Sequence, residues 1–473
     1  MSGTAAGERE SVWVLGAGLA GCEAAWQLAC RGFRVRLMEM KPRRYSPAHT
    51  YPGFAELVCS NSLKAARLGS AAGLLKHEMA RLGSLVVRCA LETSVAAGGA
   101  LAVDRFRFSD AVTEKIRRHP NIQVVPGEVK VLPEDGFGVV ATGPLTSDAL
   151  AADIARRVGK EYLSFYDAAA PIVSFDSIDR ERVFFAARYG RGEDDYINCP
   201  FTKEEYERFY TALTGAESAP LHEFDRFDRT PNPASPSVYE GCMPIEVMAR
   251  RGADTIRYGP LKPVGLTDPR TGRRPWAVVQ LRRENQEGSL YNLVGFQTNL
   301  KFGEQKRVFS MIPGLERAEF VRYGVMHRNT FLDSPRLLNN AFQLREEPRL
   351  FFAGQMTGVE GYIESAASGI QAGLNLARLL AGRELLRLPG ETMLGALAGY
   401  ISDSSVKDFQ PMGSNMGILP PLEERVRDKS KRYLTMAQRA MKALEQCLEQ
   451  AGEVPLPGLE NALADWGKDE GTE

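Results

Sequence analysis

A glycine-rich turn near the N-terminus restricts the possible folds more than any other segment of the chain. It follows an apolar run at 11–15 and precedes a helical pattern at 22–31 and a second apolar run at 33–39. Its residues are Gly16, Ala17, Gly18, Leu19, Ala20 and Gly21. Glycines at this spacing permit a tight turn, the approach of a pyrophosphate to the backbone, and close packing of helix on strand. The order predicts a Rossmann-like βαβ unit that binds a dinucleotide at the N-terminus of its helix.

The second strand of this unit ends in an acidic residue. Glu39 lies 21 residues after Gly18. At this place a carboxylate can accept hydrogen bonds from the ribose of an adenosine, and it would repel a 2′-phosphate. The unit therefore favours FAD or NAD over NADP.

Two later segments favour FAD over NAD. An apolar strand and turn occupy 138–143, and a second strand and turn occupy 350–355. The turn residues expected at the cofactor are Gly143, Gly354 and Gln355. The helical spacing over Tyr362–Leu380 would direct a helix N-terminus at a flavin ring and stabilise the negative charge of the reduced flavin. The sequence contains no further G-x-G-x-x-G, so a nicotinamide reductant would bind transiently, without a Rossmann domain of its own.

The length of the chain indicates more than one domain, because 473 residues exceed what a single hydrophobic core usually supports. We expect an α/β fold in which both ends of the chain, 1–165 and 330–473, build a Rossmann-like FAD-binding domain. An α+β domain would be inserted at 166–329. Its expected elements are strands at 184–188, 277–281 and 290–295 and a helix at 203–213.

The charge and the cysteine content exclude several classes of protein. The chain has 59 basic and 59 acidic residues, so a polyanion would have to bind a local basic patch. Seven cysteines are scattered without a C-x-x-C pair, which argues for free thiols and against a metal site. The sequence has no run of about 18 apolar residues that would indicate a membrane span, and residues 1–10 do not resemble a secretory signal. We therefore expect a cytoplasmic protein.

Five segments together resemble one protein family. They are VLGAGLAGCEAAW at 14–26, LVCSNSLK at 57–64, YEGCMPIE at 239–246, GFQTNLK at 295–301 and MHRNTF at 326–331. The family is that of the bacterial folate- and FAD-dependent tRNA uracil-5-methyltransferases, TrmFO, and the resemblance runs from about residue 12 to about residue 440. It implies a GidA-like flavoprotein fold and methylation of uridine-54 in the T-loop of tRNA. The carbon donor would be 5,10-methylenetetrahydrofolate, and the reductant would be FAD reduced by NAD(P)H.

Two other functions stay open at the level of the sequence. The larger flavoprotein of tRNA wobble-uridine modification, MnmG or GidA, shares the AGCEAA segment and a comparable Gly-Tyr-x-Glu turn at 361–364. Two features argue against this alternative. The chain is short, which leaves little room for the helical C-terminal region of that protein, and Cys242 lies in a Glu-Gly-Cys-Met-Pro segment. The third possibility is a flavin oxidoreductase that acts on small molecules and binds no RNA.

Carbon transfer to a uracil requires a nucleophile and a base. An enzyme of this type commonly adds a thiolate to C6, which makes C5 nucleophilic, and a base then removes the C5 proton. The resemblance implies Cys242 as the nucleophile and Cys59 as the proton-abstracting partner, although the two roles could be exchanged. Considered without the family, each cysteine fits an ordinary buried or unreactive thiol better than a catalytic one.

The resemblance also suggests that the imidazole of His327 stacks on the folate pterin against the flavin, whereas the residues alone fit a histidine with an ordinary role in a loop.

Basic residues gather at 423–442, where a tRNA contact is expected at Arg425, Lys429 and Arg432. An apolar stripe at helical spacing would pack the other face of this helix, and its members are Leu434, Ala437, Met441, Leu444 and Leu448. The alternative is a solvated helix face. The arginine pairs at 250–251 and 282–283 are weaker candidates for the same contact.

Overall fold

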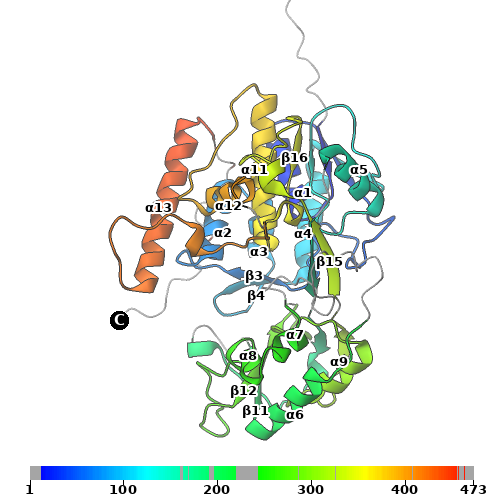
Figure 1. The fold of residues 1–473 in the computed structure, drawn as a ribbon, viewed down its shortest axis with the longest axis vertical. Coiled ribbons are helices and arrows are strands. Elements are labelled where there is room, and N and C mark those ends of the chain that lie inside the picture. Colours follow the sequence, from blue (N-terminus) through cyan, green and yellow to red (C-terminus); the bar gives the residue numbers. More distant parts are fainter. Residues whose placement is uncertain are drawn as a thin grey trace, which may run out of the picture.

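The computed structural model describes residues 12–159, 163–168, 170–190, 196–219, 243–285, 287–324, 326–406, 409–454, 456 and 463, with the backbone alone for 163–168, 190 and 326–330. Two bodies are visible in Figure 1. The larger one, which we call the parallel-sheet domain, holds the N-terminal and C-terminal parts of the chain, and the smaller inserted domain holds the middle part, drawn in green. Each body has its own hydrophobic core.

A parallel sheet of five strands forms the centre of the parallel-sheet domain, in the order β16-β7-β1-β2-β6. Its strands are β1 (Val12–Leu15), β2 (Val35–Glu39), β6 (Ile122–Pro126), β7 (Gly138–Val140) and β16 (Leu350–Phe352). Every residue of β1, β7 and β16 is buried, as expected for parallel strands that are covered on both faces. Strands from both ends of the chain therefore share one sheet, which confirms the predicted Rossmann-like α/β fold.

The first helix, α1 (Leu19–Cys30), begins three residues earlier than its sequence pattern indicates. Gly18 is the N-cap, so the last residues of the glycine turn already belong to the helix. The strand that follows begins at Val35 rather than at 33, because a turn through Gly32, with a φ of 85°, separates it from the helix.

The long helix α11 (Tyr362–Leu380) has the bounds that the sequence predicts, and it packs against α1. Gly369 and Gly373 face Ala20 and Ala24 of α1, and a Cβ atom on either glycine would collide with the carbonyl oxygen of the facing alanine. The absence of two side chains thus allows the backbones of the two helices to touch. From the first contact to the second, the residue number rises by four in both helices, so the helices run in the same direction.

The other helices of the parallel-sheet domain are α2 (Ala71–Arg81), α3 (Leu85–Glu92), α4 (Arg105–Arg118), α5 (Asp148–Val158), α10 (Ser334–Leu337), α12 (Met393–Ser402) and α13 (Lys429–Gln450). A small antiparallel sheet, in the order β3-β5-β4, consists of β3 (Ser62–Ala65), β4 (Ser94–Val95) and β5 (Ala100–Val103). Within the described ranges, none of the helices combines the length and the apolar character needed to cross a membrane.

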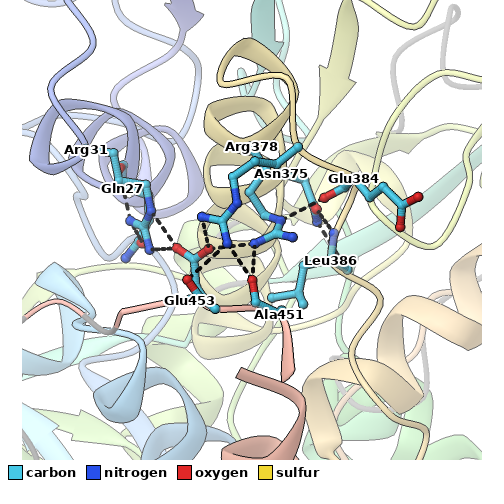
Figure 2. Close-up of polar contacts among 10 residues, drawn as sticks. Gln27, Arg31, Asn375, Arg378, Glu384, Leu386, Ala451 and Glu453 are labelled. Carbon is cyan, nitrogen blue, oxygen red and sulfur yellow. Dashed lines mark hydrogen bonds and ion pairs between the residues drawn. The ribbon is translucent and has the colours of Figure 1, made fainter. Parts of the chain in front are cut away.

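The chain beyond α13 is anchored to the two helices that meet at the glycines. Figure 2 shows the carboxylate of Glu453 between Arg31, at the end of α1, and Arg378 of α11. Arg31 Nε and Nη2 donate to Glu453 Oε1 at 3.1 and 3.0 Å, and Arg378 Nη1 donates to Oε2 at 2.7 Å. Arg383 adds a third contact at 3.2 Å. The carboxylate is buried, so charged hydrogen bonds rather than solvent compensate it.

The apolar stripe predicted along α13 is correct for most of its members and wrong for one. Ala437, Leu444 and Leu448 are buried and Met441 is half-buried against the core, but Leu434 is 42 % exposed, and Met436 and Ala440 are buried in addition. Leu434 lies beside Gly69, which has no side chain to cover it.

The inserted domain contains a six-stranded sheet in the order β10-β11-β12-β13-β9-β14, with antiparallel pairing throughout. The strands are β9 (Ile172–Ser174), β10 (Phe184–Phe185), β11 (Tyr196–Phe201), β12 (Ala277–Arg283), β13 (Leu290–Leu293) and β14 (Phe320–Arg322), and the helices are α6 (Lys203–Thr214), α7 (Ile245–Arg250), α8 (Ala253–Tyr258) and α9 (Phe302–Phe309). The expected strand at 184–188 is shorter in the structure, because a 3₁₀ turn at Arg188–Gly190 ends the extended backbone.

A two-stranded antiparallel ribbon links the two domains. It consists of β8 (Leu163–Ala168) and β15 (Met326–Phe331), which carry the chain into and out of the inserted domain. The expected domain limits lie within this ribbon, where Phe165 pairs with Asn329.

The contact between α1 and α11 can be tested by adding one methyl group. We expect Gly369→Ala to lower the free energy of unfolding by about 1–3 kcal/mol, because the new Cβ atom forces the two backbones apart. Gly399 is the matched control, since it also lies in a helix but no atom lies within 4 Å of a Cβ built there. Gly399→Ala should raise stability by up to about 1 kcal/mol. Equal effects of both substitutions in urea unfolding would contradict close packing at Gly369.

Candidate functional site

A cavity of about 430 Å³ extends from the glycine turn to the N-terminus of α11. The predicted cofactor residues that line it are Gly16, Ala17, Gly18, Leu19, Ala20, Glu39, Gly143, Gly354 and Gln355. Cys59 lines the same cavity. Gly21 does not, because it lies under the turn. Residues that are more than 300 positions apart in the sequence therefore share one wall.

The three glycines of the turn have different physical roles. Gly16 has a φ of 91°, and a Cβ atom there would lie 2.6 Å from the carbonyl oxygen of Ala141 on the neighbouring strand connection. At Gly21 a Cβ atom would collide with the carbonyl oxygen of Gly16. At Gly18 it would meet no atom within 4 Å. The first and the last glycine are thus required by the fold, whereas the second leaves space for a ligand at the start of α1.

Glu39 presents its carboxylate at the end of β2. The N–H group of Ala17 donates to Oε2 at 2.7 Å, and the N–H group of Lys41 donates to Oε1 at 2.8 Å. These bonds fix the side chain and leave further lone pairs on both oxygens for hydroxyl groups of a ribose. The Lys41 ammonium points elsewhere and donates to the carbonyl oxygens of Tyr51 and Gly53.

Turns that require positive φ angles form other parts of the wall. Gly143 has a φ of 76° and follows the Ala141–Thr142 backbone beside Gly16, Gly354 has a φ of 87°, and Gly361, the N-cap of α11 at the far end, has a φ of 122°. Gln355 is held by its amide, which donates to Glu360 Oε2 at 2.6 Å. The first N–H groups of α11 have no acceptors within the helix, so this end of the cavity favours a negative charge.

Cys59 is in direct contact with Tyr362, the first residue of α11. The N–H groups of Cys59 and Ser60 donate to Tyr362 Oη at 2.7 and 3.4 Å, and Cys59 Sγ lies 3.0 Å from the same oxygen. Because two N–H groups point at the lone pairs of this oxygen, its own proton is available for the sulfur. Burial, and next the neighbouring Cys59, raise the pKa of Tyr362 well above its ordinary value, so the phenol stays a neutral donor.

A charged pair that is not among the predicted site residues lies beside this contact. Lys64, which lines the cavity, has a φ of 64° in an irregular stretch of β3 and donates to Glu364 Oε1 at 2.7 Å. Burial acts to raise the pKa of Glu364, but Lys64 and the hydrogen bonds from Ser414 outweigh it, and the pKa is lowered. A sequence signal was present, because Tyr362 and Glu364 belong to the Gly-Tyr-x-Glu turn and Lys64 ends the segment that contains Cys59.

Two predicted site residues cannot be placed. Cys242 lies outside the described residues, immediately before Met243 and helix α7. The backbone of His327 is described in β15, where it pairs with Asp167, but its side chain is not. The proposed role of each stays a prediction.

The predicted tRNA residues lie apart from the cavity lining. Arg425 precedes α13 and is exposed, Lys429 is exposed at the first turn, and Arg432 is half-buried. Lys429 and Arg432 both lie 5.5 Å from the centre of the Tyr433 ring. Among the described residues, no group of three or more His, Cys, Asp or Glu side chains is arranged to hold a metal ion.

The lining of the cavity fits FAD in its chemistry. It offers open space at Gly18 for a pyrophosphate, a fixed carboxylate at Glu39 for a ribose, and a second helix N-terminus at its other end. Cys59 and Tyr362 lie at that second end, where a flavin ring would be expected.

The assignment of the pyrophosphate site can be tested at the open glycine. Gly18→Val places a branched side chain in the space next to the start of α1, so we expect the purified protein to lose the yellow colour of bound flavin while it stays folded. Gly303→Val in α9 is a control, because a Cβ atom there also meets no neighbour within 4 Å. Full FAD occupancy in Gly18→Val would exclude this position from the cofactor site.

Comparison with known proteins agrees with this geometry. The family described as "Glucose inhibited division protein A" matches residues 11–384. The methylenetetrahydrofolate–tRNA-(uracil-5-)-methyltransferase TrmFO of Acetivibrio thermocellus is 58 % identical over 433 residues, which cover 92 % of this chain and 97 % of that protein. The protein of the same name from Halalkalibacterium halodurans is 56 % identical over 437 residues, which cover 92 % of this chain and 98 % of the relative.

Two solved structures of Aquifex aeolicus GidA are similar in fold, with a TM-score of 0.66 for each. They are 17 % and 18 % identical, and the matches cover 97 % and 96 % of this chain and 75 % and 77 % of the GidA chains. The fold is therefore shared with GidA, whereas sequence identity above one half extends over nearly the whole length of the methyltransferases. The chain belongs to the TrmFO family.

Proposed function

We propose that this protein is a methylenetetrahydrofolate–tRNA-(uracil-5-)-methyltransferase. It converts uridine-54 in the T-loop of tRNA to ribothymidine with 5,10-methylenetetrahydrofolate as the carbon donor and FAD, reduced by NAD(P)H, as the reductant. The observation that carries this proposal is the position of Cys59, which lines the cofactor cavity and contacts Tyr362 at the N-terminus of α11. The GidA-like alternative has less support, because the relatives above 50 % identity carry the methyltransferase name.

Each part of the cavity has a task in this proposal. The N-terminus of α1 holds the pyrophosphate, Glu39 binds the adenosine ribose, and Gly143, Gly354 and Gln355 form the wall beside the flavin. When FAD is bound and reduced, it supplies the hydride that converts a methylene group into a methyl group. His327 stacks on the folate pterin.

The two cysteines act at different steps. Cys242 adds to C6 of the uracil and makes C5 nucleophilic, and Cys59 removes the C5 proton after the carbon has been attached. The hydroxyl of Tyr362, 3.0 Å from Cys59 Sγ, donates to the sulfur and stabilises it as an anion that can accept a proton.

The remaining assignments concern the arrangement of the chain. We propose that residues 1–165 and 330–473 form the FAD-binding domain and 166–329 the inserted domain, a division supported by the two hydrophobic cores and by the β8–β15 ribbon between them. Because the substrate is tRNA, the protein acts in the cytoplasm. Arg425, Lys429 and Arg432 contact the phosphates of the tRNA.

The main proposal is tested by transfer of label from methylenetetrahydrofolate into unmodified tRNA. The expected product is ribothymidine in the T-loop, formed without a second protein. Activity only in the presence of a partner protein would favour the GidA-like alternative. The absence of tRNA binding even at low salt would favour a flavin oxidoreductase that acts on small molecules.

The roles of the two cysteines can be separated with 5-fluorouridine in the T-loop. Its C5 substituent cannot leave as a proton, so a covalent adduct accumulates on the nucleophile. We expect Cys242→Ser to form no adduct and Cys59→Ser to form one, while both keep FAD and lose methyl transfer by roughly 10²–10⁴-fold. The reverse pattern would exchange the two roles. Normal turnover of both variants would exclude the thiol mechanism.

Binding of tRNA by the basic end of α13 can be tested through the dependence of affinity on salt. Reversal of Arg425 and Lys429 to Glu should weaken binding and reduce the slope of log affinity against log salt by about 0.7–0.9 for each phosphate that the variant no longer neutralises. A matched control reverses Arg118 and Arg156, which are highly exposed on α4 and α5. An equal decrease in both double variants would indicate a general effect of charge rather than a specific contact at α13.

A further inference from the structure

The end of β12 reaches from the inserted domain to the loop that carries Cys59. Arg282 Nη2 donates to Ser60 Oγ at 2.6 Å, and Arg282 Nε donates to Asn61 Oδ1 at 3.0 Å. Both bonds join residues more than 200 positions apart in the sequence, and the guanidinium is buried. The sequence makes Arg282 a weak candidate for tRNA contact, but these bonds occupy it inside the protein.

Asn61 is held by both domains at once. Its side chain is completely buried. Its amide nitrogen donates to the carbonyl oxygen of Val103 at 2.9 Å in the parallel-sheet domain and to the carbonyl oxygen of Arg283 at 2.8 Å in the inserted domain. Because Asn61 Oδ1 accepts from Arg282, both amide protons of Asn61 and one lone pair of its oxygen are in use. The loop after Cys59 therefore has a single position relative to β12.

The contact between the end of β12 and the Cys59 loop, which we call the seam, carries an excess of positive charge. Arg105, the first residue of α4, lies 2.8 Å from Glu284 at the end of β12, and both side chains are buried. The charged and titratable groups around Cys59 are Tyr362 of α11, Arg105 of α4, Arg322 of β14, Arg282 of β12, Glu284 directly after β12, and the Lys64–Glu364 pair beside the Tyr362 contact. Three guanidinium groups and one ammonium group thus stand against two carboxylates. An excess of this sign favours a thiolate over a thiol.

We infer that Arg282 is a positioning residue that fixes the Cys59 loop against Tyr362 and within the positive seam, so that the sulfur is held as a thiolate. The inference rests on the proposed role of Cys59 as a base, since only the deprotonated sulfur can accept the C5 proton. The proton of the thiol passes to water before substrate binds. The inserted domain thereby determines the reactivity of a residue that belongs to the parallel-sheet domain.

The test measures the thiol itself in the full-length, FAD-loaded protein without tRNA or folate. Iodoacetamide reacts with the thiolate, so the rate of alkylation of the Cys59 peptide, followed by mass spectrometry across pH 5–10, gives the midpoint of deprotonation. We expect a wild-type midpoint below that of an ordinary cysteine. Arg282→Gln should raise the midpoint by about one pH unit and slow alkylation near neutral pH about tenfold. Arg282→Lys keeps the charge but loses the paired hydrogen bonds, so its midpoint should lie between those of the wild type and of Arg282→Gln.

Arg283→Gln is the matched control. Arg283 is the next residue of β12, and its Nε has no hydrogen-bond partner among the described residues, so the midpoint for Cys59 should not change. FAD content and thermal unfolding show whether each variant is folded, and Arg282→Lys carries the test if the glutamine variant is not. An unchanged midpoint in the Arg282 variants, or an ordinary midpoint in the wild type, would overturn the inference. Methyl transfer by the wild type tests the proposed function separately.

Discussion

The packing of the α1 backbone on the α11 backbone is the constraint on which the rest of the structure depends. The two helices begin at different glycine turns, 343 residues apart, yet they run in the same direction because Gly369 and Gly373 lie on Ala20 and Ala24. Their N-termini are therefore directed at one cavity. Each N-terminus favours negative charge, so one helix suits a pyrophosphate and the other suits the charge that develops on a reduced ring. Larger side chains at these glycines would separate the two halves of the site.

The sequence was informative wherever a function depends on local backbone geometry. The glycine turn, Glu39 and the turns at Gly143 and Gly354 were all predicted, and the structure places them around one cavity. The bounds of α11 were predicted because a long buried helix has a strong period and follows directly after Gly361. Cys59 was found through a family resemblance, since a cysteine in a polar segment has no distinctive local pattern.

Interactions between distant segments were not accessible in the same way. The pairing of Tyr362 with Cys59 joins residues 303 positions apart, and neither sequence segment indicates the other. The arginine pair at 282–283 has the composition of an exposed basic patch, but the partner that buries Arg282 comes from the Cys59 loop. Leu434 fits the helical period and is nonetheless exposed, because the residue beside it is a glycine. In each case the deciding neighbour is set by tertiary packing.

The ribbon of β8 and β15 has a consequence for how far the two domains depend on each other. The strands that enter and leave the inserted domain are direct antiparallel neighbours, with Phe165 opposite Asn329, so a short turn between them would restore an ordinary hairpin. Because the chain leaves and re-enters the larger body at one place, the inserted domain does not interrupt the order of the parallel sheet.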